Sequence, residues 1–209
     1  MTPHTERTIN DYLAALSSGD PTPGGGSASA YTGAMGTALV GMVANLTKSG
    51  EDPDLRQILV TIGERAEALT SQLRDCAIVD EGVYGAYRSA AALPKSNDDE
   101  KVVRRRAINL ALIAAAEAPI QAARSANEGL RLAAECAAVG TKHALSDIRT
   151  AQHLLNASLA GALENVHINL AMLSDDKVVE RLIRAVQAVQ AETGAANQAL
   201  AEALANRAS

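Results

Sequence analysis

The sequence is nearly without aromatic residues: they make up 2% of its 209 residues, as four Tyr with no Phe and no Trp. Because β-sheets depend on aromatic and β-branched side chains that pack across a pleated surface, this composition argues against a β-sandwich, a β-barrel and a layered α/β fold. Alanine instead supplies roughly a fifth of the chain, well above ordinary usage, and it loses little on entering a helix. The sequence therefore predicts an all-α helical bundle, and its length suits one domain over residues 1–209.

A surplus of positive charge is also missing, since 24 acidic residues outnumber 19 basic ones and the formal net charge is −5. Nucleic acids and anionic membranes attract basic surfaces, and single-stranded nucleic acids stack on aromatic side chains. We therefore expect neither a nucleic-acid partner nor a membrane partner.

Cysteine is rare, and no apolar leader segment is visible near the N-terminus. The two cysteines, Cys76 and Cys136, lie in Ala-rich helical stretches and lack the spacing of a metal site or a redox motif. The histidines show no metal-ligand spacing either; they are His4, His143, His153 and His167. We expect reduced cysteines, no metal or other cofactor, and a cytoplasmic location.

Charge is absent altogether from Pro21 to Thr47, a stretch long enough to span a bilayer. It starts with a Pro- and Gly-rich loop, and the remainder is mostly Ala, Gly, Ser and Thr, without the usual cationic and aromatic anchors. We expect a small-residue helix buried at the centre of the bundle instead of a membrane span.

Proline, glycine and helix-capping residues divide the chain into about seven predicted helices. The expected spans are Thr5–Ser18, Ser27–Lys48 with Ser27 as N-cap, Pro53–Ala92, Asp98 to a break or kink at Pro119, Pro119 to Ala138, His143–Leu173, and Ser174 to the C-terminus.

The third predicted helix carries a carboxylate among its apolar positions. Alternating steps of four and three residues connect Leu55, Leu59, Ile62, Ala66, Leu69, Leu73, Cys76, Asp80, Val83 and Tyr87. This spacing is typical of one packed helix face. A carboxylate on that face must be hydrogen-bonded, paired or raised in pKa, which suits an acid–base group in a pocket. A structural ion pair, or a helix end open to water, would also explain Asp80.

A polar stripe of small residues follows the same steps on the sixth predicted helix. It comprises Asp147, Ala151, Leu154, Ser158, Gly161, Asn165 and Asn169. Small residues bounded by polar ones leave room for a ligand between helices, although a solvated face would show the same pattern.

The glycine loop Gly24–Gly26 leads into a helix that begins near Ser27. Exposed backbone N–H groups and the positive end of the helix dipole favour an anion such as phosphate or carboxylate at such a place. A tight turn would account for the same residues.

Several short motifs follow one another along the chain. They are Pro21-Thr22-Pro23-Gly24-Gly25-Gly26-Ser27, Gly33-Ala34-Met35-Gly36, Met42-Val43-Ala44-Asn45-Leu46-Thr47, Asp80 one turn before Tyr84, Leu93-Pro94-Lys95, Glu100-Lys101, Ala118-Pro119-Ile120, Ser146-Asp147, Asn165-Val166 and Ile168-Asn169-Leu170. In this order they resemble the formimidoyltetrahydrofolate cyclodeaminase / methenyltetrahydrofolate cyclohydrolase family over essentially the whole chain.

The resemblance implies an all-α homodimer with folate sites near the subunit interface and no metal or redox cofactor. By resemblance, Asp80 is the catalytic proton acceptor, and Lys95 faces the glutamyl tail of the folate. The resemblance, together with the polar stripe and the scarce aromatics, predicts a set of substrate-binding residues. They are Gly24, Gly25, Gly26, Ser27, Tyr84, Lys95, Asp147, Asn165 and Asn169.

The activity that the resemblance implies is hydrolysis of 5,10-methenyltetrahydrofolate to 10-formyltetrahydrofolate. The alternatives are a formimidoyltetrahydrofolate cyclodeaminase that releases ammonia, a divergent folate-binding homologue without catalysis, and a purely structural bundle. Ile78, Val83 and Thr141 depart from the residues usual in the family, and these departures leave the substrate preference open.

Overall fold

The computed structural model describes residues 7–208, and this part of the chain forms six α-helices and one 3₁₀ turn, without a strand. The elements are α1 (Ile9–Leu16), α2 (Gly25–Leu46), α3 (Pro53–Ala91), α4 (Asp98–Val139), η2 (Lys142–Ala144), α5 (Leu145–Leu170) and α6 (Asp176–Ala208). The predicted all-α fold is confirmed, whereas the predicted number of helices is one too many among the described residues.

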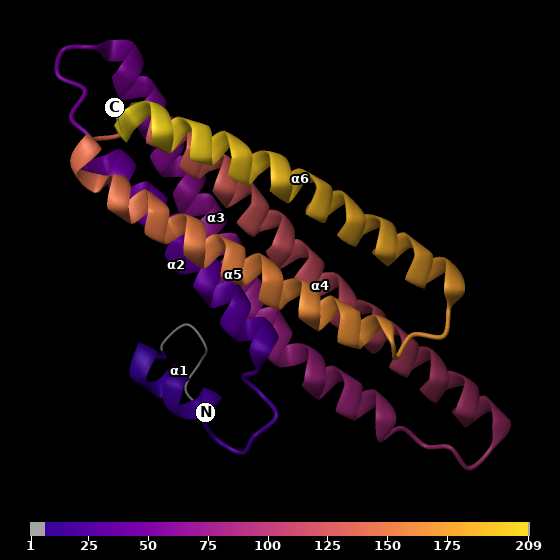
Figure 1. Cartoon of the computed structure of the whole chain (residues 1–209). Helices are drawn as coiled ribbons and strands as arrows, with labels where there is room; N and C mark the ends of the chain where they lie inside the picture. The colour runs from indigo at the N-terminus through magenta and orange to yellow at the C-terminus, as the bar shows by residue number, and fades with distance from the viewer. Residues whose placement is uncertain (1–6, 209) are drawn as a thin grey trace.

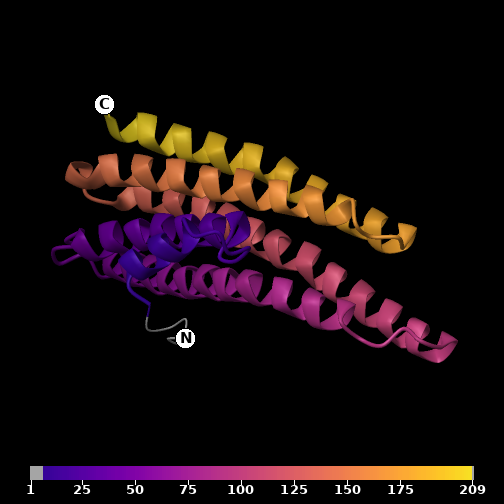
Figure 2. The ribbon, with the colours of Figure 1, turned by 90° about the horizontal axis from the view of Figure 1, so that it is seen from below.

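The long helices α2 to α6 lie side by side along one axis, and the connection between α3 and α4 extends beyond the end of the bundle at which α2 begins (Figures 1 and 2). Helix α2 packs against α3, α4 and α5. At 22 residues it is much shorter than α3, with 39, or α4, with 42. The first turn of α2 therefore lies partway along its neighbours and leaves the farther parts of α3, α4 and α5 uncovered by it.

Small residues allow α2 to approach its neighbours closely. A Cβ built on Gly36 would lie 2.8 Å from Cγ of Leu155, and one built on Gly129 of α4 would lie 2.9 Å from Cγ2 of Thr37. These positions tolerate no side chain without movement of a neighbour. The charge-free stretch is thus a helix of the bundle, but the predicted burial at the centre holds for one face of α2: ten of its 22 residues are buried, whereas Met35, Met42 and Leu46 are exposed. None of the helices within residues 7–208 combines the length and hydropathy needed to cross a bilayer.

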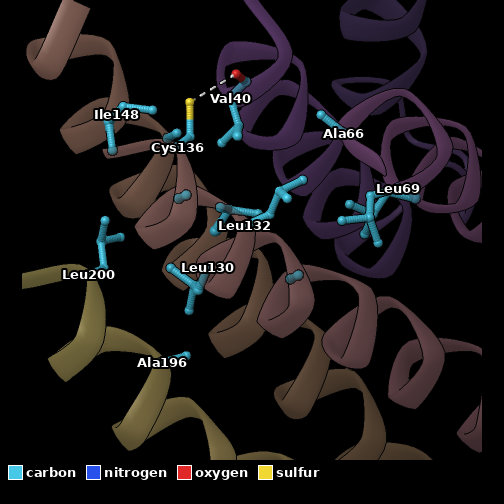
Figure 3. Packing of buried hydrophobic residues seen from close by; sticks show 14 of the residues in the cluster. Val40, Ala66, Leu69, Leu130, Leu132, Cys136, Ile148, Ala196 and Leu200 are labelled. Atoms are coloured by element: carbon cyan, nitrogen blue, oxygen red, sulfur yellow. Dashed lines mark hydrogen bonds between the residues drawn. The ribbon is translucent and has the colours of Figure 1, made fainter. Parts of the chain in front are cut away.

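The core beside α2 is aliphatic, and Cys136 is one of its members (Figure 3). The thiol Sγ of Cys136 lies 3.7 Å from the carbonyl oxygen of Val40, to which it donates a hydrogen bond. Cys136 is fully buried, Cys76 is half-buried, and both thiols are free.

Helix α4 continues through Pro119, so the predicted division into two helices at this residue is wrong. Proline has no N–H, and in a regular helix the N–H of residue 119 would bond to the carbonyl oxygen of Ala115. The side-chain amide Nδ2 of Asn169 in α5 donates to that carbonyl oxygen instead, at 2.8 Å. A donor from a neighbouring helix thus replaces the one that proline removes.

The beginning of α2 also differs from the prediction. Gly24, and not Ser27, is the N-cap residue, and it provides no side-chain hydrogen bond. The other predicted helix starts are close: Asp52 caps α3 directly before Pro53, and the carboxylate of Asp175 accepts the N–H groups of Lys177 and Val178 at the start of α6. Of the first predicted helix, Thr5 lies outside the described residues.

Candidate active site

A cleft with a volume of about 340 Å³ opens where α2 begins, between α2, α3, α4 and α5. Four of the ten motifs contribute to its walls: the Pro21–Ser27 loop, Asp80 with Tyr84, Asn165-Val166 and Ile168-Asn169-Leu170. The predicted site residues that line it are Gly24, Gly25, Gly26, Asp80, Tyr84, Asn165 and Asn169. Apolar side chains complete the walls, among them Leu112 from α4, Ile168 from α5 and Met172 from the turn that follows α5.

Asp80 projects from α3 onto the first turn of α2. Its Oδ2 accepts the backbone N–H of Ser27 at 2.8 Å, so Asp80 supplies from another helix the cap that Gly24 lacks. Gly26 faces the carboxylate directly, because a Cβ at this position would overlap all three atoms of the carboxyl group. The glycines of the loop therefore allow the carboxylate to contact the backbone.

The pKa of Asp80 is raised above its ordinary value. Burial is the largest cause because it disfavours the charged form, and the nearby charge of Glu81 raises the pKa further, whereas the hydrogen bond from Ser27 lowers it. The site thus contains a half-buried carboxyl group that binds a proton more readily than an exposed aspartate does.

Glu81 is a site residue that the sequence analysis missed. Its side chain is 4% exposed and pairs with Arg7, whose Nη1 lies 3.0 Å from Oε2. The hydroxyl of Ser27 donates to Oε1 of Glu81 at 3.1 Å, and the hydroxyl of Tyr12 lies 3.1 Å from the same serine oxygen. Ser27 therefore joins the two adjacent carboxylates, with its N–H on Asp80 and its O–H on Glu81.

The helix periodicity explains why Glu81 was missed. Steps of four and three residues assume 3.5 residues per turn, whereas a straight helix has 3.6 and drifts by about 20° per heptad, or about 60° between Leu59 and Asp80. The buried positions of α3 accordingly pass from Leu73 to Ala77 and Glu81, and Asp80 moves to the edge of the buried face. A correction for this drift is the signal that would have identified Glu81.

Two asparagines of α5 form the opposite wall of the cleft. Nδ2 of Asn165 donates to the carbonyl oxygen of Gly161 at 2.8 Å, and its amide lies against Gly25, where a Cβ would be 3.5 Å from Nδ2. Asn169 lies one turn farther along α5 and bonds to Ala115 as described. Both predicted asparagines thus lie at the cleft, held by backbone carbonyl groups.

The remaining predicted residues fall in three places. Ser27 lies behind Asp80, as one of its hydrogen-bond donors. Lys95 lines a separate basic pocket near the connection of α3 and α4, together with Lys101, Arg104 and Arg105. Asp147 lies near the other end of α5, about 27 Å along the helix from Asn165 and about 33 Å from Asn169. One copy of the chain brings neither Lys95 nor Asp147 to the cleft, and their roles remain predictions.

Much of the polar stripe on α5 is a packing surface. A Cβ on Gly33 of α2 would lie 3.1 Å from Cβ of Ser158, and one on Gly161 would lie 3.2 Å from Cβ of Ser29. These small residues lie at the contact between α2 and α5, and the stripe opens into the cleft at its Asn165 end. Of the departures from the family pattern, Val83 lines the cleft, whereas Thr141 bonds to Thr47 beyond the far end of α2.

Among the described residues that line the partly apolar cleft, Asp80 is the one with a carboxyl group. Within the described part of the chain, no three His, Cys, Asp or Glu side chains gather as a metal site. Tyr84 and Tyr87 provide flat surfaces, 41% and 37% exposed. A carboxylate beside such surfaces suits a planar, positively charged ligand that must exchange a proton.

Comparison with known proteins gives consistent matches. The sequence model described as formiminotransferase-cyclodeaminase matches residues 8–188. The methenyltetrahydrofolate cyclohydrolase of Methylorubrum extorquens is 36% identical over 200 residues, which cover 93% of this chain and 94% of that protein. The formimidoyltransferase-cyclodeaminase of Rattus norvegicus is 27% identical over 181 residues, which cover 84% of this chain but 33% of that protein.

A solved structure agrees with these matches. The crystal structure of formiminotetrahydrofolate cyclodeaminase from Thermotoga maritima superposes with a TM-score of 0.84 at 26% sequence identity. The match covers 97% of this chain and 98% of that one, so it includes the cleft and every helix around it.

Proposed function

The chain belongs to the formiminotransferase-cyclodeaminase family, and we propose that it hydrolyses 5,10-methenyltetrahydrofolate to 10-formyltetrahydrofolate in the cleft beside Asp80. The 36% identical cyclohydrolase supports this choice, because the match extends over nearly the full length of both proteins. The animal relatives support the reaction class less directly, since this chain spans about a third of their length.

Asp80 has two tasks in the proposed reaction. The bridge carbon of the substrate shares a positive charge with N5 and N10, and an ionised Asp80 attracts that charge in a site of low polarity. Asp80 then accepts a proton from a water molecule as the water oxygen bonds to the bridge carbon. When the bond between this carbon and N5 breaks, one water proton ends on N5, and the other is released with the 10-formyl product.

The observation that best supports the proposal is the position of Asp80 in the cleft. It is half-buried at the cleft, its pKa is raised by burial, and its orientation is fixed by the N–H of Ser27. A raised pKa makes a carboxylate a stronger proton acceptor near neutral pH. The flat tyrosine rings and the apolar wall suit a pterin ring next to it.

The decisive experiment follows the absorbance of methenyltetrahydrofolate with purified protein. We expect the protein to accelerate the loss of this absorbance, and Asp80→Asn to reduce the acceleration by about 10²- to 10⁴-fold while helical content stays intact and the unfolding temperature does not fall. Asp75→Asn removes an exposed carboxylate from the same helix and is expected to keep the activity. Undiminished turnover in Asp80→Asn would remove this residue from the mechanism.

A second candidate is the cyclodeaminase reaction, which the structural match to the Thermotoga maritima enzyme favours. In this reaction N10 of 5-formiminotetrahydrofolate attacks the formimino carbon, ammonia leaves, and Asp80 transfers the proton between the two nitrogens. Ammonia release, measured beside the methenyltetrahydrofolate assay, separates the two activities. A folate-binding homologue without catalysis would instead show thermal stabilisation by folate and no turnover.

We further propose a cytoplasmic homodimer that needs no metal or redox cofactor. Exposed apolar side chains on α1 and α4 support self-association, among them Leu13, Val102 and Val103, and the free thiols suit a reducing compartment. We expect a solution mass of twice the chain mass of 21.6 kDa and full activity after EDTA treatment. A monomeric mass, or activity lost to EDTA and restored by a metal, would contradict these points.

A further inference from the structure

The two asparagines at the cleft have fixed amide orientations. Nδ2 of Asn165 donates to the carbonyl oxygen of Gly161, and Nδ2 of Asn169 donates to that of Ala115, both at 2.8 Å. Within residues 7–208, no donor forms a hydrogen bond to either Oδ1 atom, although both side chains line the cleft. The α5 wall therefore presents two side-chain carbonyl oxygens as free acceptors.

Pro119 explains why the side-chain amide of Asn169 keeps one orientation. Because Pro119 lacks an N–H, the carbonyl oxygen of Ala115 has Asn169 as its donor. A turned amide would place Oδ1 against this carbonyl oxygen and leave it without a partner, which is costly in a partly buried position. Pro119 thus determines which end of the Asn169 amide is available to a ligand, without lining the cleft itself.

The two acceptors extend away from the reacting carboxylate. Asn165 lies against Gly25, next to the glycine that faces Asp80, and Asn169 lies about 6 Å farther along α5. A ligand whose reacting carbon lies at Asp80 would therefore place its distant end beside Asn169. That end must carry hydrogen-bond donors to match the two oxygens.

We propose that Asn165 and Asn169 recognise the N3–H and the 2-amino group of the substrate's pyrimidine ring, and that Pro119 is a positioning residue for this recognition. The proposal rests on the proposed function, since it takes a tetrahydrofolate as the ligand. In the bicyclic pterin, these donors lie on the ring remote from the N5–N10 bridge. A site with fixed acceptors rejects a ligand that lacks the matching donors more strongly than an apolar pocket does.

The test compares two ligands, tetrahydrofolate and its 2-desamino-2-methyl analogue, by calorimetric Kd. We expect the wild-type protein to bind the analogue roughly 10-fold more weakly or worse. Asn169→Leu is expected to weaken tetrahydrofolate binding and to reduce this discrimination to about 3-fold or less. Asn156→Leu is the matched control, because it removes an amide from the same helix, where Asn156 bonds to Gln152 and Asn197 instead of lining the cleft. It is expected to keep the discrimination.

A double variant separates recognition from structure. Asn169→Leu leaves the carbonyl oxygen of Ala115 without a donor and is expected to lower the unfolding temperature. Adding Pro119→Ala restores a helical N–H, so the double variant is expected to recover the unfolding temperature but not the discrimination. Pro119→Ala alone frees the amide of Asn169 and is expected to raise KM more than it lowers kcat.

The outcomes are distinct from those that test the proposed reaction. Equal Kd values of the wild-type protein for the two ligands, no measurable binding of either, or recovery of discrimination in the double variant would each overturn the inference. Absence of methenyltetrahydrofolate turnover contradicts the proposed reaction, whereas the Kd ratio is measured without turnover.

Discussion

The carboxyl group of Asp80 occupies the space in which a Cβ of residue 26 would lie, so it can take this position because residue 26 is glycine. The N–H of Ser27 then fixes the carboxylate at 2.8 Å. The glycine loop therefore provides room for the carboxylate at the start of α2, in addition to exposed backbone N–H groups.

The first prediction concerns this fit. Gly26→Ala should displace the Asp80 side chain and lower kcat/KM by about 10²-fold, since a misplacement of about 1 Å can have that effect. Gly82→Ala is the control: it lies on α3 with no atom within 4 Å of a built Cβ and should stabilise the helix by about 0.5–1 kcal/mol. Measurement of kcat/KM and urea unfolding for both variants checks this. Full activity in Gly26→Ala would mean that the position of Asp80 does not matter.

The second prediction concerns stability and pH. The pKa of Asp80 is raised in the folded state, mainly by burial, so its contribution to folding is greatest below the ordinary aspartate pKa of about 3.9 and is lost as the pH rises through the folded-state value. Asp80→Asn should therefore gain stability relative to the wild-type protein at neutral pH. This advantage should shrink as the pH falls. A difference in unfolding free energy that is the same at every pH would contradict the assignment.

The third prediction uses the neighbouring charge. Glu81 raises the pKa of Asp80 through its negative charge, so Glu81→Gln should move the acid limb of the kcat/KM profile to lower pH. The variant should also lose about 3 kcal/mol of stability, because it breaks a buried ion pair. Arg7→Gln breaks the same ion pair but keeps the Glu81 charge, so it should not move the acid limb of the kcat/KM profile to lower pH. Identical limbs in Glu81→Gln and the wild-type protein would exclude this coupling.

The fourth prediction concerns the thiols. Burial raises the pKa of Cys136 to about 12, and the residue is inaccessible in the core, so iodoacetamide at mildly alkaline pH should leave it unmodified in the folded protein. Cys76 is half-buried and should react slowly. Mass spectrometry should detect Cys136 labelling after unfolding in urea. Rapid native labelling of Cys136 would show that the core opens there.

The sequence predicts the main features of this site because they depend on local patterns. The glycine loop, the charge-free helix and the carboxylate on α3 each come from spacing or composition, and the structure brings them to one cleft. The continuity of α4 through Pro119, where the sequence predicted two helices, has a different origin. The compensating donor, Asn169, comes from another helix 50 residues farther along the chain, and no local pattern contains that information.

The interpretations of Asp147 and Glu81 show two further limits. The stripe that contains Asp147 has the residue types of a ligand slot, but small residues also allow two helices to pack closely. Whether such a stripe binds a ligand or packs against a helix depends on what lies opposite it in the fold. Glu81 is next to Asp80 in the sequence, and the drift in helix phase determines which of the two lies on the buried face of α3. Lys95 and Asp147 remain predictions that an assembly of more than one chain can test.

Helix α2 has ten buried residues among its 22 and carries the glycine turn of the cleft at its first residues. The geometry of the cleft at the start of α2 is therefore tied to the same packing that holds α3, α4 and α5 together. Heat inactivation should then coincide with the cooperative loss of helical circular dichroism. The rate of turnover should then report the fraction of folded protein. Substitutions that stabilise the bundle core should raise the upper temperature limit of activity by as much as they raise the unfolding temperature.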